Sequence, residues 1–139
     1  MKIATASYPL DVFQTWADYE AKLTKWVSEA ADRLPEADAL HVKLAAEYKV
    51  HILAASAPYV PAAGQRPVNR ARLFAPTGQV GVQDKQIMTR FEEEVWDVVP
   101  GNALQLFDTA LGKMGILICY DSEFPLLARA LSDADLILI

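Results

Sequence analysis

The sequence predicts an α/β layered domain built around a mixed sheet. Short apolar runs typical of buried strands alternate with segments of helical spacing at both ends of the chain. The middle of the chain has the pattern of a β-hairpin. With 139 residues, of which 53% are hydrophobic and 22% charged, the chain is expected to form a single globular domain over residues 1–139.

The first half of the chain is predicted to contain two strands and two helices. In order these are a strand at 3–8, a helix at 11–33, a helix at 36–48, a strand at 50–56 and a surface loop at 58–67. The apolar residues of the second helix recur at helical spacing, so Leu40, Leu44 and Ala45 are expected to form its buried stripe.

The second half begins with the predicted hairpin at 69–85, whose turn is Pro76-Thr-Gly78. It continues with a charged loop and short helix at 86–100, strands at 104–107 and 114–119, a helix at 126–131 and a strand at 136–139. Because a strand at an open end leaves a sheet edge uncovered, we expect a partner chain or further sequence to cover it.

Composition excludes several classes of function. The net charge of −5, with no basic block, argues against a nucleic-acid platform or an anionic membrane surface. The sequence has no apolar run of membrane-spanning length, and its first residues lack signal-peptide architecture, so we expect a cytoplasmic protein. One cysteine and two histidines are too few for a convincing zinc cluster, and neither a metal nor an organic cofactor is expected.

The single cysteine, Cys119, follows the apolar run Met114–Ile118 and precedes a helix with Pro125 in its first turn. A turn between a strand and a helix holds a side chain out of the sheet and presents free N–H groups beside it. Cys119 is therefore a candidate nucleophile. The alternative is a small buried hydrophobic residue, a common role of free cysteine.

A cysteine nucleophile also needs a base and a group that stabilises negative charge. His41 and His51 are not predicted to lie beside a turn. The other candidates are Lys85, at the end of the hairpin, and the carboxylates of residues 92–94. A lysine beside a carboxylate and a thiol can place positive charge near the transition state.

Four segments together resemble the nitrilase (carbon–nitrogen hydrolase) superfamily. The nucleophile segment of that family is similar to Gly115–Pro125, and its hairpin-then-lysine segment is similar to Gly81–Met88. The further similarities are Asn69-Arg-Ala with Pro76-Thr-Gly78, and Val99-Pro-Gly-Asn102 with Leu104–Asp108. The resemblance implies a nitrilase-like α-β-β-α sandwich, of which this chain represents about the N-terminal half.

The resemblance also implies roles for individual residues. Cys119 would attack an amide or nitrile carbon and form a thioester or thioimidate, and Lys85 would stabilise the oxyanion together with the backbone N–H of Tyr120. Glu94 fits best as the family's second glutamate, with Glu92 as the alternative, whereas Glu93 is expected to be solvated. Asp121 and Glu123, in the first turn after the cysteine, are expected to compensate a helix dipole or to form a salt bridge.

One departure from the family pattern concerns its general base, a glutamate in a Phe-Pro-Glu-type motif after a buried strand. The chain's only Pro-Glu, Pro35-Glu36, follows Asp32 and Arg33, which do not suit such a strand. Glu36 is therefore expected to start a helix rather than act as the base. We expect no carboxylate from residues 30–40 beside Cys119 and Lys85, and a chain break or vacant strand position near residues 33–35.

Two functions follow from the sequence. The first is hydrolysis of a small-molecule amide, in preference to a nitrile, through a Glu-Lys-Cys site in a homodimer or higher homo-oligomer. The second is a catalytically inactive protein of the same fold that acts as an interaction or structural subunit, because the base glutamate is not evident.

Overall fold

The computed structural model describes residues 15, 17, 18 and 35–139. The predicted strand at 3–8 lies outside the described residues, as does most of the predicted helix at 11–33, of which residues 17 and 18 are helical. A helix over residues 35–48 is followed by β1 (Ile52–Tyr59), β2 (Val68–Phe74), β3 (Val80–Asp84), α2 (Arg90–Glu94), β4 (Leu106–Thr109), β5 (Gly112–Ile116), the 3₁₀ helix η1 (Cys119–Glu123), α3 (Pro125–Ala130) and β6 (Leu136–Leu138).

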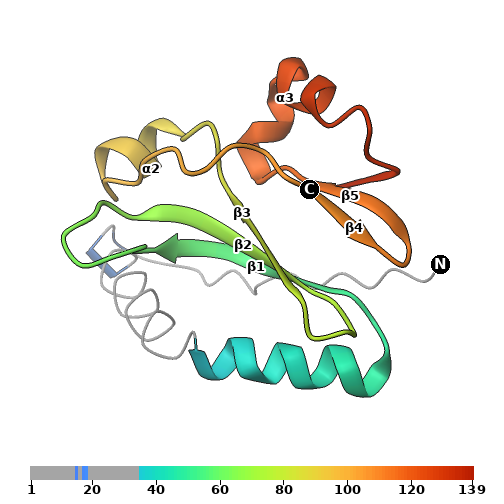
Figure 1. Ribbon diagram of the computed structural model, residues 1–139. Helices are drawn as coiled ribbons and strands as arrows, with labels where there is room; N and C mark the ends of the chain where they lie inside the picture. The colour runs from blue at the N-terminus through green and yellow to red at the C-terminus, as the bar shows by residue number, and fades with distance from the viewer. Residues whose placement is uncertain (1–14, 16, 19–34) are drawn as a thin grey trace.

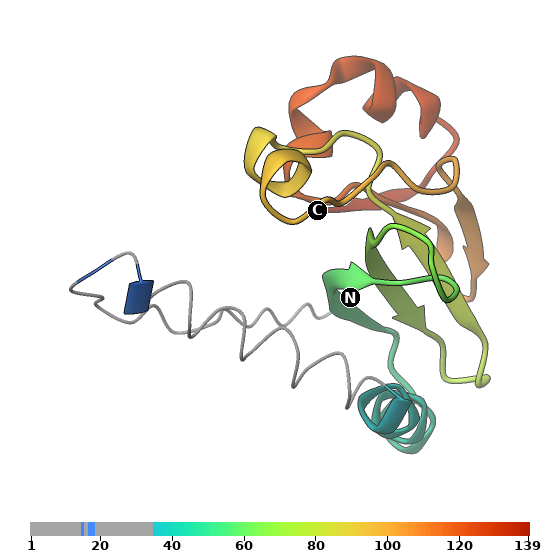
Figure 2. The same ribbon diagram turned by 90° about the vertical axis from the view of Figure 1, so that its left-hand side faces the viewer.

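The strands form two sheets of three strands each. In the first, β2 pairs antiparallel with both β1 and β3. The second is mixed, because β5 pairs antiparallel with β4 and parallel with β6. The helix over residues 35–48 lies on one outer side of the molecule and α3 on the other (Figures 1 and 2). The described residues therefore have the layer order helix, sheet, sheet, helix.

The core lies between the two sheets. Alternate side chains of a strand point to opposite faces, so Ala71 and Leu73 of β2 share the face that meets the second sheet. Met114 and Ile116 of β5, with Ile118 just beyond it, complete the buried cluster, and each is at most 5% exposed. Burial of one such side chain contributes about 1.5–3 kcal/mol.

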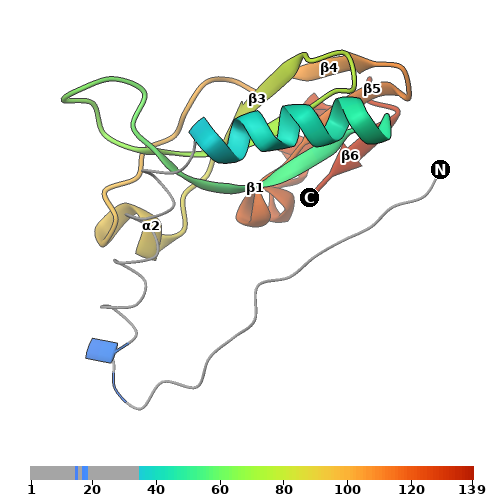
Figure 3. The same ribbon diagram turned by 90° about the horizontal axis from the view of Figure 1, so that it is seen from below.

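The other face of β2 packs against the helix over residues 35–48, which lies across this sheet (Figure 3). Arg72 pairs with Asp38 at 3.1 Å, and the rings of Phe74 and His41 stack at 5.0 Å. The helix thus turns the stripe Asp38, His41 and Ala45 inward. Leu40 is 53% exposed, so its predicted burial is wrong: two residues beyond Asp38 is about half a helical turn away.

The predicted hairpin is confirmed. Its register runs from Arg70 opposite Asp84 to Phe74 opposite Val80. The turn is closed by a hydrogen bond from Ala75 N to Gln79 O of 2.9 Å, and Gly78 has φ +87°. This conformation is open to glycine because it has no Cβ.

The strand containing the cysteine segment is shorter than predicted. β5 ends at Ile116, although residues 114–118 are all buried, as expected for the apolar run. Leu117 N still donates to Leu138 O at 2.9 Å. Leu131, the residue that caps the C-terminus of α3, packs so closely on β5 that a Cβ on Gly115 would lie 2.9 Å from its side chain. Two buried residues, Leu117 and Ile118, thus lead from β5 to η1, which Cys119 begins.

Candidate active site

Lys85 immediately follows β3, and its buried side chain is 2% exposed. Its main chain is held on both sides, because its N–H donates to Asn69 O at 2.8 Å and its carbonyl accepts from Gly101 N at 3.1 Å. The Lys85 ammonium lies 2.6 Å from Oε2 of Glu92. A buried lysine and a buried glutamate thus form an ion pair at the end of the hairpin.

Glu92 is positioned by a capping box at the start of α2. The Thr89 hydroxyl accepts from Glu92 N at 3.3 Å, and the N–H and hydroxyl of Thr89 each lie 2.8 Å from Oε2 of Glu92. Asn69 Nδ2 donates to Oε1 at 2.9 Å. Burial raises the pKa of Glu92, but hydrogen bonds from Lys85, Thr89 and Asn69 outweigh it and lower the pKa from 4.5 to about 2. The carboxylate is therefore ionised at neutral pH and suited to holding an ammonium rather than to accepting a proton.

Asn69 brings a further polar atom to this pair. Since its Nδ2 faces the Glu92 carboxylate, its Oδ1 points elsewhere, and that oxygen is buried without a partner among the described residues. A buried acceptor without a donor is costly, so such an atom is expected to meet water or a ligand. The site thus offers a fixed anion, an ammonium and one free acceptor.

Glu94, the predicted second glutamate, lies elsewhere. Its carboxylate accepts from Arg90 Nε at 2.8 Å, and its side chain is 58% exposed. Glu93 is also exposed. The structure brings Glu92, the sequence alternative, to Lys85. The Thr89-x-x-Glu92 capping box could have indicated this, because the glutamate of such a box turns back toward the helix start.

Cys119 lies at the predicted turn between strand and helix, and it is exposed. The buried alternative for this thiol is therefore wrong. Its φ of +50° is a left-handed conformation that few residues other than glycine adopt. Ser122 Oγ donates to Cys119 O at 2.8 Å, and the following residue, Tyr120, packs edge-on against Phe124. The exposed thiol thus sits on a tightly bent backbone, an arrangement that recurs at functional sites.

Asp121 connects this turn to the end of the hairpin. Its buried carboxylate accepts from the backbone N–H of Ile118 at 3.2 Å, of Gln86 at 3.1 Å and of Ile87 at 2.8 Å. The bond from Ile118, the residue before η1, is that of an acidic residue at a helix start, as expected, whereas no salt bridge of Asp121 is present among the described residues and its bonds from Gln86 and Ile87 are additional. Ile118, which precedes Cys119, and Gln86 and Ile87, which follow Lys85, therefore all donate to the Asp121 carboxylate.

A second buried ion pair holds the loop after α2. Asp84 Oδ1 accepts from Arg70 Nε at 2.6 Å, and Asp84 Oδ2 accepts from Asn102 N at 3.2 Å. Burial raises the pKa of Asp84, but these hydrogen bonds lower it overall. Gly101 passes so close that an added Cβ would lie 2.1 Å from the Cβ of Asp84. Gly101 N of this loop also donates to the Lys85 carbonyl, so the loop restrains the main chain of Lys85.

Glu36 occupies the first turn of the helix over residues 35–48 and is exposed. Residues 35–40 are the described part of 30–40, and within them Asp38 pairs with Arg72. The carboxylate that pairs with Lys85 is that of Glu92. Residues 33 and 34, where a break or vacant strand was predicted, lie outside the described residues.

Over residues 15, 17, 18 and 35–139, no three His, Cys, Asp or Glu side chains gather to hold a metal ion. Within the described segments no helix has both the length and the apolar character to cross a membrane.

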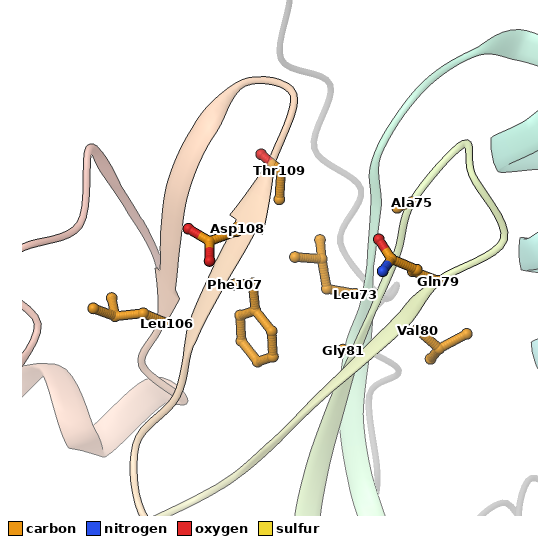
Figure 4. A pocket seen from close by; sticks show the side chains of 9 residues that line it. All are labelled: Leu73, Ala75, Gln79, Val80, Gly81, Leu106, Phe107, Asp108 and Thr109. Atoms are coloured by element: carbon orange, nitrogen blue, oxygen red, sulfur yellow. The ribbon is translucent and has the colours of Figure 1, made fainter.

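A hollow between the start of β3 and β4 is separate from this site. Figure 4 shows Phe107 and Leu73 pointing into it, with Val80 and Gly81 on the β3 side. Lys85 follows the opposite end of β3, and none of the site residues lines the hollow.

Comparison with curated proteins finds hydrolases. Residues 13–139 match the family described as Carbon-nitrogen hydrolase. Probable hydrolase YhcX of Bacillus subtilis is 39% identical over 68% of this chain and 18% of its own length. Nitrilase 3 of Arabidopsis thaliana is 31% identical over 82% of this chain and 30% of its own length. Omega-amidase NIT2-B of Xenopus laevis is 29% identical over 76% and 41%. The chain thus spans less than half the length of each of these relatives.

Solved structures of the same family share the fold. A carbon-nitrogen hydrolase from Helicobacter pylori G27 aligns with a TM-score of 0.67 and 27% identity over 78% of this chain and 38% of that chain. Nit3 of Saccharomyces cerevisiae, a member of the nitrilase superfamily, aligns with a TM-score of 0.56 and 28% identity over 64% and 32%. The predicted nitrilase-like fold is confirmed over this part of the chain.

Proposed function

Because the chain belongs to the carbon–nitrogen hydrolase family, we propose that it hydrolyses the carbon–nitrogen bond of a small amide with Cys119 as the nucleophile. The observation that carries the proposal is the link through Asp121 between the turn of Cys119 and the segment after Lys85. An exposed thiol, a buried ammonium and a fixed carboxylate are thereby assembled on one scaffold. That set suits nucleophilic attack on a polarised carbon.

The proposed reaction has two halves. The Cys119 sulfur bonds to the amide carbon, and the carbonyl oxygen takes the negative charge, which the Lys85 ammonium and the Tyr120 N–H stabilise. The carbon–nitrogen bond then breaks, and the nitrogen leaves as ammonia with the proton that the thiol gave up. Water next attacks the thioester, releases a carboxylic acid and returns a proton to the sulfur.

Glu92, rather than Glu94, is the carboxylate we assign to this site. It touches Lys85, whereas Glu94 pairs with Arg90 on an exposed surface. With its pKa lowered to about 2, it is ionised at neutral pH and holds the ammonium in place. The role we assign to it is thus to orient Lys85 rather than to accept the thiol proton.

An amide is favoured over a nitrile by the free acceptor on Asn69. Oδ1 of this residue is buried beside the ion pair and lacks a donor among the described residues. The proposal is that the substrate reaches this oxygen: a primary amide carries two N–H donors that could bind it, and a nitrile carries none. The names of the relatives include both amidases and nitrilases.

The test is ammonia release from a series of small linear amides. Wild-type protein should release ammonia and should show a covalent acyl adduct by intact mass during turnover. Cys119→Ser and Cys119→Ala should release none above the buffer blank while unfolding at the wild-type midpoint. Hydrolysis that persists in the alanine variant would remove Cys119 from the reaction.

The alternative, an inactive protein of this fold that serves as an interaction or structural subunit, is favoured by the exposed position of Glu36 at a helix start. It predicts that iodoacetamide modifies Cys119 at the rate of an ordinary thiol, whereas the enzyme predicts faster labelling. Homodimeric or higher assembly and a cytoplasmic location stay predictions.

A further inference from the structure

The side chain of Asp121 is fully buried, with a relative exposure of 0%. Its neighbour in the same turn, Glu123, is exposed, as acidic residues near helix starts commonly are. Burial of a carboxylate is unfavourable unless hydrogen bonds replace its water. For Asp121 these bonds come from main-chain N–H groups, and within the described residues no ion pair involves it.

The donors to this carboxylate belong to two separate segments. Oδ2 accepts from Ile118, the residue before Cys119, at 3.2 Å. Oδ1 accepts from Gln86 and Ile87, the two residues after Lys85, at 3.1 and 2.8 Å, and Gln86 N also lies 3.3 Å from Oδ2. Gln86 and Ile87 lie more than 30 positions from Asp121 along the chain, so the carboxylate joins the turn of Cys119 to the segment after Lys85.

The same residue also closes the bend at Cys119. Asp121 N donates to Ile118 O at 3.1 Å while its carboxylate accepts from Ile118 N. Ile118 is therefore bonded to Asp121 through both of its main-chain polar groups. A non-glycine residue at φ +50° is retained only where its surroundings hold it, and these two bonds supply that restraint on Cys119.

We propose that Asp121 is a positioning residue of the site: it holds the Cys119 turn against the Lys85 segment and so fixes the thiol relative to the ammonium. The inference rests on the proposed function, in which both groups act on one carbon. In this role the Asp121 carboxylate does not contact the substrate.

Asp121→Asn tests this directly, because it keeps the shape and removes one acceptor. An amide has a single acceptor oxygen, and Gln86 N lies within reach of both positions, so the variant loses either the bond from Ile118 or the bond from Ile87. Glu123→Gln is the matched control, since it removes the same charge from the same turn without touching those bonds. Loss of a nearby negative charge by itself favours a thiolate. Electrostatics alone therefore predicts faster alkylation in both variants, and positioning predicts slower alkylation in Asp121→Asn.

The measurement is the rate of iodoacetamide modification of Cys119, followed by intact mass across neutral to alkaline pH. We expect Asp121→Asn to react at least about tenfold more slowly than wild type, because small displacements of a reacting group have large kinetic effects. Glu123→Gln should react at or above the wild-type rate. A purely structural role would lower the unfolding midpoint and leave the rate of the folded protein unchanged, and that result would overturn the proposal, as would faster alkylation in Asp121→Asn.

Ammonia release from the same samples separates this proposal from the proposed function. Rapid alkylation that depends on Asp121, without ammonia release by wild type, refutes the hydrolase and supports the positioning role. Ammonia release with equal alkylation and turnover in Asp121→Asn overturns the positioning role and leaves the hydrolase standing. If Asp121→Asn does not fold, Asp121→Glu decides: its oxygens are displaced by one methylene, so slower alkylation supports the role and an unchanged rate overturns it.

Discussion

Glu92→Gln removes one charge from the buried pair and keeps the shape of the side chain. The Lys85 ammonium, on a side chain 2% exposed, then faces a neutral amide. Breaking a buried ion pair on one side typically costs about 3–5 kcal/mol. The pKa gives an independent figure: lowering from 4.5 to about 2 corresponds to about 3 kcal/mol of stability, at about 1.4 kcal/mol per pKa unit. The two figures are of the same order.

The sign of the pH dependence follows from the direction of this shift. Because the pKa of Glu92 is lower in the folded protein, its contribution to stability is complete above its unfolded value of 4.5. The contribution is lost as pH falls through about 2, where the folded carboxylate takes up a proton. The difference in free energy of unfolding between wild type and Glu92→Gln should therefore be large at neutral pH and shrink between pH 4.5 and about 2.

The assay is urea unfolding followed by circular dichroism at a series of pH values. Taking the difference between the two proteins cancels carboxylates common to both, including Asp84, whose pKa is also lowered. Glu94→Gln is the matched control, because its exposed pair with Arg90 is worth about 0–1 kcal/mol. Equal losses in the two variants, or a Glu92→Gln loss that does not vary with pH, would refute the reasoning.

Two further predictions concern the residues around this pair. Lys85→Ala should lower the turnover number by about 10²–10³, since one oxyanion donor is worth about 3–4 kcal/mol; steady-state ammonia release checks this, and an unchanged turnover number removes Lys85 from the chemical step. Gly101→Ala should destabilise the protein by about 1–3 kcal/mol, because its Cβ would lie 2.1 Å from that of Asp84 and the main chain must shift. An unchanged thermal unfolding midpoint would contradict the close approach.

The sequence was most informative where a pattern is local. The apolar run before Cys119 and Pro125 after it predicted a turn between strand and helix, and the structure places an exposed thiol there. Pro76-Thr-Gly78 likewise predicted the hairpin turn. In both places neighbouring residues alone determine the backbone, so composition and spacing suffice.

The contacts that assemble the site could not be read in the same way. Three consecutive glutamates are equivalent by spacing, and only the capping box at Thr89 distinguishes Glu92. Asp121 has the sequence context of an ordinary helix start, because its donors at Gln86 and Ile87 reach it only through the tertiary fold. Leu40 satisfied the helical period but lies outside the stripe that packs on β2.

The tight turn between β2 and β3 has a consequence for how the chain tolerates insertions. Neighbouring strand residues point to opposite faces, so Asp84 meets Arg70 on one side of the sheet and Lys85 meets Glu92 on the other. If the register of β3 shifted by one, adding a residue in the turn would move Asp84 to the place of Lys85 and set a carboxylate against Glu92, whereas removing a residue would put Gln86 there. A one-residue change of this kind is usually tolerated in a surface loop. Here a one-residue insertion, although it lies at the far end of the hairpin, would alter the candidate site.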